Sequence, residues 1–487
     1  MGGAVAVEAA AVDIASIPAM SRKVLKMHAR LIVIGIVSAW MPLAAARAQF
    51  PEDALRLSEE GTGVGARALG MGNAFTAVAD DYTALFWNPA GLAQLYHNEV
   101  SVGISNLSFG NMSSFFGSQR SFSNDKTNLD NFGVVYPVPT FRGSAVVALG
   151  YSRSSEFTTA LSFDGFNTSS SIVPSLFRPD TTADVAYLLY LERPDGSTPI
   201  QNDVRQHGTV LEAGGINQWS AAGAIDVAKN FSAGLTLNFL TGSYRFTRNF
   251  TEEDSRNVYS AFPFDYDALE LSNTVDSDIT GFTAKFGMHY RDERMKLGLT
   301  VKTPSWFSVD ERFSTDGRSF FDNGDSYSTQ SNNVTSYDVV TPFVFSGGTA
   351  LSLAGLTLSG DADYTDWTQM EFRNATTELL QENTTIKEIF RPTVQWRLGA
   401  QFQIPTFDVS LRGGFMMNPS RYRDDPSSFD RKYVTGGIGL NVADAVSVDA
   451  AYAHGWWKTF RVNYDSSSRT DEDVTTNTIL LSASFRF

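Results

Sequence analysis

The last ten residues of the chain, Thr478-Ile-Leu-Leu-Ser-Ala-Ser-Phe-Arg-Phe487, decide the fold because large apolar and mostly polar side chains alternate along them. One set contains Ile479, Leu481, Ala483, Phe485 and Phe487, and the other contains Thr478, Leu480, Ser482, Ser484 and Arg486. Successive side chains of a strand point to opposite faces, so this stretch predicts a strand with one apolar face. Lipid outside and water inside a barrel produce this pattern.

The same alternation recurs from His97 onward and gives fourteen predicted strands. Their centres are Val102, Val134, Val147, Ala224, Leu235, Ala284, Leu299, Phe343, Leu358, Leu398, Leu411, Ile438, Val448 and Leu481. An even number of strands is typical of a closed bacterial outer-membrane barrel.

The predicted connections alternate between short and long. Short turns at 140–143, 228–230, 291–294, 354–355, 405–406 and 443–445 interleave with seven long polar stretches. A soluble sandwich has no reason to place every long connection at one end, whereas outer-membrane barrels have short periplasmic turns and long extracellular loops. We therefore predict an all-β protein, a transmembrane antiparallel β-barrel of fourteen strands over residues 97–487.

The first fifty residues predict export. Basic residues at 22, 23, 26 and 30 precede the apolar run Leu31–Ala46, and Ala46-Arg47-Ala48 is a small-x-small cleavage site. We expect a signal peptide over residues 1–48, with translation starting at Met20 or Met27 and a mature chain from Gln49. The apolar run is short for a spanning helix, which leaves an N-terminal anchor as the alternative.

Composition excludes several other classes of protein. The chain of 487 residues is 43% hydrophobic and carries a net charge of −15, which argues against disorder and against nucleic-acid binding. It contains no Cys, and we find no catalytic or metal-binding motif, so we predict no enzyme activity, no catalytic residues, no metal and no cofactor. The acidic runs Asp322–Asp325 and Thr470–Asp473 lack EF-hand spacing and are interpreted as solvated loop tips.

The segment 49–96 does not alternate and is rich in glycine. It contains Gly61-Thr-Gly63-Val-Gly65-Ala-Arg67-Ala-Leu-Gly70-Met-Gly72-Asn73-Ala74-Phe75, then Ala79-Asp80-Asp81, and then Trp87-Asn88-Pro89-Ala90-Gly91. The glycine spacing matches neither the dinucleotide nor the Walker pattern. We interpret the segment as a compact, tightly turning element.

These motifs resemble the FadL/TodX-type outer-membrane transporters of long-chain fatty acids and other hydrophobic compounds. The resemblance implies that residues 49–96 form a hatch, or plug, inside the lumen of a fourteen-stranded barrel, and that ligand leaves laterally beside a kinked third strand. The hatch and gating residues it implies are Gly61, Gly63, Gly65, Gly70, Gly72, Asn73, Phe75, Asp80, Asp81, Asn88 and Pro89. The motif Ala68-Leu-Gly-Met-Gly72 also resembles PorV-like relatives that serve protein secretion.

Two further features bear on ligand binding. The stretch around Tyr187, Leu188 and Leu191 predicts a short helix that either lines an apolar groove or packs a loop against the barrel rim. Arg397 and Arg412 lie on polar strand faces, where each is a candidate contact for a ligand carboxylate or a partner for carboxylates such as Asp361, Asp363 or Asp408.

The sequence thus favours a monomeric channel in the outer membrane of a diderm bacterium. We expect passive uptake of hydrophobic small molecules, with outer-membrane lipids and the outer-membrane assembly machinery as partners and no contact with nucleic acid. The alternative is a PorV-like accessory of protein secretion or surface assembly, and a general porin is a third hypothesis.

Overall fold

The computed structural model describes residues 51–404, 406–442 and 445–487. The predicted signal peptide and its cleavage site lie outside these residues. No helix in the described ranges is both long and apolar enough to cross a membrane.

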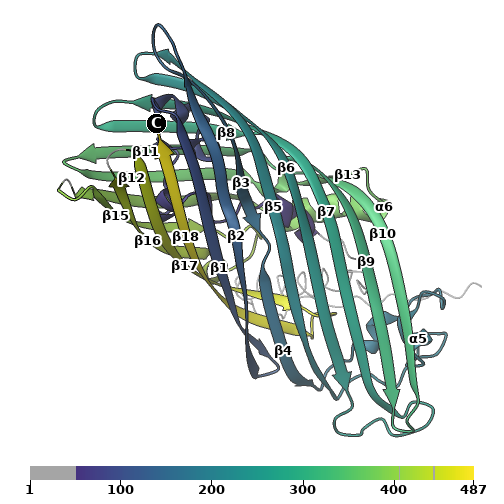
Figure 1. Cartoon of the computed structure of the whole chain (residues 1–487). Helices are drawn as coiled ribbons and strands as arrows, with labels where there is room; N and C mark the ends of the chain where they lie inside the picture. Colours follow the sequence, from purple (N-terminus) through teal and green to yellow (C-terminus); the bar gives the residue numbers. More distant parts are fainter. Residues whose placement is uncertain (1–50, 405, 443–444) are drawn as a thin grey trace, which may run out of the picture. The chain divides into compact units, whose positions relative to one another are not determined.

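The described chain forms one antiparallel sheet of eighteen hydrogen-bonded strands (Figure 1). They are β1 (Glu99–Phe115), β2 (Ser118–Val138), β3 (Ala145–Glu156), β4 (Thr159–Asn167), β5 (Val204–Ala228), β6 (Phe231–Glu253), β7 (Tyr266–Arg291), β8 (Met295–Lys302), β9 (Trp306–Phe321), β10 (Ser326–Val340), β11 (Val344–Leu353), β12 (Leu356–Asp366), β13 (Glu371–Arg373), β14 (Pro392–Ile404), β15 (Val409–Asn418), β16 (Arg431–Val442), β17 (Val446–Val462) and β18 (Arg469–Arg486). The sheet closes because β1 pairs with β18 along sixteen residues.

Four pairs of these strands each form one interrupted barrel strand: β3 with β4, β8 with β9, β10 with β11, and β12 with β13. β3 and β4 both pair with β5, and β8 and β9 both pair with β7. β10 pairs with β9, and β11 pairs with β8. On the other side, β13 pairs with β10, and β12 pairs with β11. The described residues therefore form a closed barrel of fourteen antiparallel strands, which confirms the predicted fold.

The apolar and polar faces of the strands also lie as predicted. In β18, Ile479 and Leu481 are about half exposed, whereas Leu480 between them is 2% exposed. Leu480 packs with Ala66 and Leu69 of the N-terminal segment inside the barrel. The outward face of each strand carries an apolar band that matches a bilayer, and the inward face is mostly polar.

Short helices account for the rest of the regular structure. Before the barrel lie α2 (Pro51–Ser58), α3 (Ala66–Gly70), α4 (Ala84–Trp87) and the 3₁₀ helix η1 (Pro89–Gln94). The connections between strands contain η2 (Val173–Leu176), α5 (Val185–Leu188), η3 (Trp367–Gln369), α6 (Thr377–Ile389) and η4 (Ser427–Phe429).

The predicted short turns are found wherever the structure describes them, but the prediction of seven long connections is wrong in part. β1 and β2 are joined by only Phe116 and Gly117, and β9 and β10 by residues 322–325. Much of the polar sequence is strand, so that β7 reaches 26 residues while β15 has 10. Beyond the lipid the outward face of a strand contacts water and carries polar residues too, so the alternation that marks a strand in the sequence disappears although the hydrogen-bond ladder continues.

The sidedness of the barrel remains a prediction that cysteine labelling tests, since the chain has no native Cys. Asp471 lies at the end of the barrel opposite the short turns, paired with Ser114, and Arg294 lies in a short turn. We expect a cysteine introduced at Asp471 to react with a membrane-impermeant reagent in intact cells, while one at Arg294 reacts only after the outer membrane is opened. The opposite labelling pattern would mean that the short turns face the cell exterior.

Candidate functional site

Residues 51–96, called the N-terminal segment here, lie inside the barrel. Inward-facing wall side chains hydrogen-bond to its backbone: Ser232 Oγ donates to the Ala90 carbonyl and Thr236 Oγ1 to the Leu85 carbonyl, both at 2.9 Å. Thr236 is fully buried, whereas its neighbour Leu237 is exposed on the lipid-facing side. The segment is the purple ribbon among the walls in Figure 1. A barrel of fourteen strands is too wide for wall side chains alone to fill, and this segment supplies the filling.

Glycines allow the segment to approach the wall closely. Gly72 has a φ of 60°, a left-handed conformation that favours glycine, and its N–H donates to Thr435 Oγ1 at 3.0 Å. A Cβ on Gly72 would lie 2.7 Å from the Leu398 carbonyl oxygen. The wall has matching glycines, since a Cβ on Gly414 would lie 2.2 Å from the Gly72 nitrogen.

The other candidate residues of the glycine-rich stretch also make specific contacts. Gly61 donates its N–H to the Ser154 carbonyl of β3 at 2.8 Å, and Gly65 donates to Asp130 Oδ2 of β2 at 3.1 Å. Gly63 lies against the ring of Trp87, Gly70 lies against Gly437 of the wall, the Asn73 amide contacts the Thr62 carbonyl, and Phe75 packs edge-on against Trp87.

Asn88 and Pro89 join α4 to η1 and are fixed from three sides. Asn88 is fully buried, and its Nδ2 donates to the carbonyls of Thr76 at 2.9 Å and Met288 at 3.1 Å. Its Oδ1 accepts from Ala90 N at 3.1 Å, which caps η1, while Pro89 occupies the first position of that helix. One side chain therefore connects two turns of the N-terminal segment to β7.

Asp80 and Asp81 belong to a charged network within the lumen. Arg67 Nη1 lies 2.5 Å from Asp80 and 3.5 Å from Asp81, and Lys296 of β8 lies 3.0 Å from Asp80. Burial alone would raise the pKa of Asp80, but the two cations outweigh it and hold this pKa well below its ordinary value. The network ties the middle of the N-terminal segment to the wall.

A second charged group surrounds Glu60. Lys302 Nζ lies 2.7 Å from its carboxylate, and Lys285 Nζ donates to the Phe86 carbonyl at 2.6 Å. Burial would raise the pKa of Glu60, but Lys302 and Lys285 outweigh it and lower the pKa to about 2. Glu60 is thus ionised at any pH well above that value.

Arg397 and Arg412 are both paired with wall carboxylates. Arg397 forms an ion pair with Asp363 and lies 5.5 Å above the Trp87 ring. Arg412 lies 2.6 Å from Asp449, a partner that the sequence analysis missed because the two residues are adjacent only through the β15–β16–β17 register. A role for either arginine in holding a ligand carboxylate stays a prediction.

The three candidate groove residues are placed differently from one another. Leu191 is fully buried in an apolar cluster with Leu189 and Ala186, whereas Leu188 is exposed and Tyr187 is half-buried. The cluster packs the 168–203 connection against β5, β6, β7 and β9.

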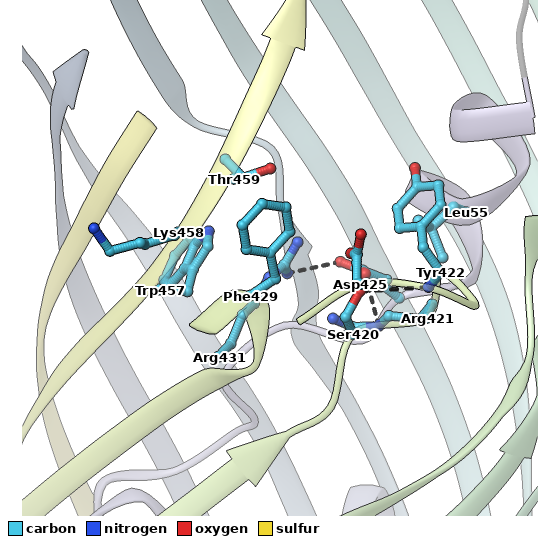
Figure 2. Close-up of a pocket in the computed structure, with 11 residues that line it drawn as sticks. Leu55, Ser420, Arg421, Tyr422, Asp425, Phe429, Arg431, Trp457, Lys458 and Thr459 are labelled. Carbon is cyan, nitrogen blue, oxygen red and sulfur yellow. Dashed lines mark hydrogen bonds and ion pairs between the residues drawn. The ribbon is translucent and has the colours of Figure 1, made fainter. Parts of the chain in front are cut away.

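Figure 2 shows a cavity that the sequence analysis did not find. It has a volume of about 60 Å³ and lies between α2, the 419–430 connection and β17. Glu59 lies 3.0 Å from Arg421 and 2.9 Å from Arg431 at this cavity. Neither arginine stands out in sequence, because loops contain many charged residues and only the fold brings these two to Glu59. Pockets that bind drug-sized ligands have volumes of about 300–1,000 Å³, so this cavity does not hold such a ligand as it stands.

The third barrel strand is broken beside the N-terminal segment. β3 pairs with β2 only as far as Ser152 opposite Asn131, and within the described residues no ladder joins β4 to β2. Opposite the break, Gly214 of β5 has a φ of 116°. The N-terminal segment contacts this place, since Ser155 Oγ donates to the Glu59 carbonyl at 2.7 Å. The alternation in sequence located β3 but gave no sign of the break.

A closed barrel with an apolar outer band and a filled lumen defines a class of outer-membrane barrel proteins. The model of the outer membrane protein transport protein family (OMPP1/FadL/TodX) matches residues 204–487, so the chain belongs to this family of transport proteins. The resemblance noted in the sequence is thereby confirmed, as are the predicted fold and the outer-membrane location.

Solved structures share the fold at low sequence identity. A Pseudomonas aeruginosa FadL homologue has a TM-score of 0.55 and 14% identity, covering 88% of this chain and 99% of its own. The P. putida toluene transporter TodX has a TM-score of 0.55 and 11% identity with the same coverage, and the CymD monoaromatic hydrocarbon channel has 0.51 and 14%, covering 88% of this chain and 98% of its own. A comparison with curated protein sequences found no match.

The contact between Gly72 and Gly414 makes a testable prediction about the N-terminal segment. We expect Gly414→Ala to push the segment off the wall, because close-packed backbone atoms cannot yield to a Cβ at 2.2 Å. Trypsin should then cleave after Arg67 at least about tenfold faster in the folded barrel, because the segment opens more often. Gly413→Ala is the matched control, since its Cβ would meet only the Thr435 carbonyl oxygen, at 3.9 Å. Equal cleavage rates in the two variants would contradict close docking at this position.

Proposed function

We propose that this outer-membrane protein lets hydrophobic small molecules, such as long-chain fatty acids or hydrocarbons, enter the cell passively. In this proposal the N-terminal segment is a hatch that closes the lumen, and ligand leaves sideways through the wall between β2 and the β3–β4 strand. The toluene transporter and the monoaromatic hydrocarbon channel among the structural neighbours favour ligands of this class.

The observation that carries the proposal is the missing ladder between β2 and β4 at the place where Glu59 and Gly61 contact β3. Beyond Asn131 and Ser152 the two barrel strands contact through side chains, as where Asn128 Nδ2 donates to Glu156 Oε2 at 2.7 Å. Side-chain contacts open at lower cost than a continuous ladder of backbone hydrogen bonds in lipid. Movement of the hatch would therefore uncover the weakest part of the wall.

The energetics require no coupled energy source. Transfer of apolar surface out of water gains roughly 25 cal/mol per Å², so a hydrophobic ligand partitions into an apolar lumen and then into lipid. The cavities of about 60 Å³ and about 10 Å³ beside Glu59 and Glu60 are too small for such a ligand. Passage of a ligand at this place therefore needs the hatch to move.

The PorV-like accessory role stays an alternative prediction. Purification distinguishes the two functions: an accessory co-purifies with partner proteins, whereas a transporter binds detergent or fatty acid in its lumen.

Cross-linking tests the lateral exit. Asn128→Cys with Glu156→Cys places two thiols across the gap, and a short cleavable thiol cross-linker would join β2 to the end of β3. We expect uptake of a labelled long-chain fatty acid or of toluene to fall about tenfold or more and to recover when the linker is cleaved, because the gate can no longer open. Tyr151→Cys with Asn217→Cys, which joins strands already paired by a ladder, is the matched control and should leave uptake unchanged. Undiminished uptake in the cross-linked gap variant would exclude this exit.

The hatch function makes a separate prediction at Asn88 and Pro89. Asn88→Ala with Pro89→Ala removes the hydrogen bonds to Thr76, Met288 and Ala90 and frees the backbone at the first residue of η1. We expect normal folding and surface abundance with altered uptake of a fatty acid or an alkane, since the hatch loses a fixed point of attachment. Uptake equal to that of the unchanged protein at matched abundance, for both ligands, would leave the N-terminal segment as a passive plug.

A further inference from the structure

Arg248 of β6 lies on the lumen face of the wall and has two nitrogens without an acceptor. Its Nε and Nη2 are both buried, and neither has a hydrogen-bond partner among the described residues. The same face of β6 carries Tyr244 and Phe250, which are buried, whereas Arg245 and Asn249 on the outward face are exposed. Buried donors are almost always paired, so this side chain needs an explanation.

The position of Arg248 lies between the N-terminal segment and the 168–203 connection. Four residues before it, the Tyr244 ring packs against Arg56 of α2, whose guanidinium carbon is 3.8 Å from the ring centroid. Two residues after it, Phe250 belongs to the apolar cluster that packs the 168–203 connection. A ligand entering the lumen at the end opposite the short turns would pass this place before it reaches the N-terminal segment.

No carboxylate compensates the charge of Arg248 in the described part of the chain. The ionisable groups that act on it are Arg461, which is a second cation, and the phenol of Tyr464. Glu212 and Glu472 lie close by, but they pair with Arg461, at 3.0 Å and 3.9 Å. A buried cation without an opposite charge destabilises a fold, so Arg248 does not owe its place to an ion pair within the chain.

The other surroundings of Arg248 are largely apolar. Its guanidinium carbon lies 4.9 Å from the centroid of the Phe250 ring, and the buried side chain of Val210 is opposite it in the β5–β6 register. Phe246, on the same face of β6, packs against the apolar clusters on both sides. The Glu252 carboxylate farther along the strand already accepts hydrogen bonds from the 168–203 connection and from β5.

The two unpartnered nitrogens have the geometry of a carboxylate site. The N–H groups of Nε and Nη2 lie along one edge of the planar guanidinium and point in parallel, so that they match the two oxygens of a carboxylate. The contact with Phe250 uses the flat face of the guanidinium and leaves this edge free.

We propose that Arg248 binds the carboxylate of an amphiphilic ligand, so that the channel prefers long-chain carboxylates to neutral molecules of the same length. This inference rests on the proposed function and selects among its ligands. Arg248 as a whole is only half-buried, and rotation of its side chain would present the free edge to the lumen. Arg397 and Arg412, the candidates from the sequence, are already paired with Asp363 and Asp449.

Binding of two ligands that differ only in their head groups tests the proposal. The probes are radiolabelled oleate and oleyl alcohol, added to the mature chain in lipid nanodiscs, with the uptake of protein-free nanodiscs subtracted. We expect Arg248→Gln to bind oleate about tenfold more weakly and oleyl alcohol as the unchanged protein does, because only the carboxylate uses the charge. Arg245→Gln is the matched control, since Arg245 lies three residues away on the outward face, and it should leave both affinities unchanged.

Stability separates ligand binding from a structural role. Without ligand, Arg248→Met should unfold at the same urea concentration as the unchanged protein or at a higher one, because it removes a buried charge that has no partner. Arg248→Lys keeps the charge but loses the paired N–H groups, so it should recover only part of the oleate affinity. A lower unfolding midpoint of Arg248→Met together with unchanged oleate affinity of Arg248→Gln would assign Arg248 to the fold and overturn the proposal.

Two further results would also overturn the carboxylate site. One is an equal loss of affinity for oleate and oleyl alcohol in Arg248→Gln, and the other is displacement of labelled oleate by inorganic phosphate as effectively as by unlabelled oleate. Uptake of oleyl alcohol by cells, with oleate binding that does not depend on Arg248, would refute this inference and leave the transport proposal standing. If neither ligand binds the protein or enters cells, the proposed function itself fails.

Discussion

Every backbone N–H and C=O in the hydrocarbon part of a bilayer has to be satisfied within the protein, and the rest of this structure depends on that constraint. Strands satisfy it only if the sheet has no edge, which the pairing of β1 with β18 provides. Closure over fourteen strands then fixes a lumen wider than the wall side chains fill. A second element inside the barrel is the consequence.

The N-terminal segment meets this need through apolar packing against the wall and through polar contacts with it. Serine, threonine and lysine side chains of the wall donate to its carbonyls, and wall glycines such as Gly414 let its backbone approach closely. Ion pairs at Asp80 and Glu60 add fixed attachments. The segment is therefore attached to the wall at many separate points.

Outside the hydrocarbon the constraint is relaxed, and the structure changes there. Strands run on with polar residues on their outward faces as well, and within the described residues β10 continues with a neighbouring strand on one side only. Water satisfies the backbone groups that a ladder no longer satisfies. The strand extensions therefore lie at the end opposite the short turns, and the break in the third barrel strand lies next to the N-terminal segment.

The sequence by itself determined the class of the protein, the fourteen strands and the faces that contact lipid. Ile479 and Leu481 in β18 illustrate why: one-sided contact with lipid imposes a period of two that is readable in a single chain. It also marked residues 49–96 as a non-strand element, because glycines replace the alternation. The tertiary structure alone decided how far β7 and β10 extend, where β3 breaks, and that Arg412 pairs with Asp449 and Glu59 with Arg421 and Arg431. These depend on strand register and on which residues closure brings together across the lumen, and neither leaves a periodic trace in the sequence.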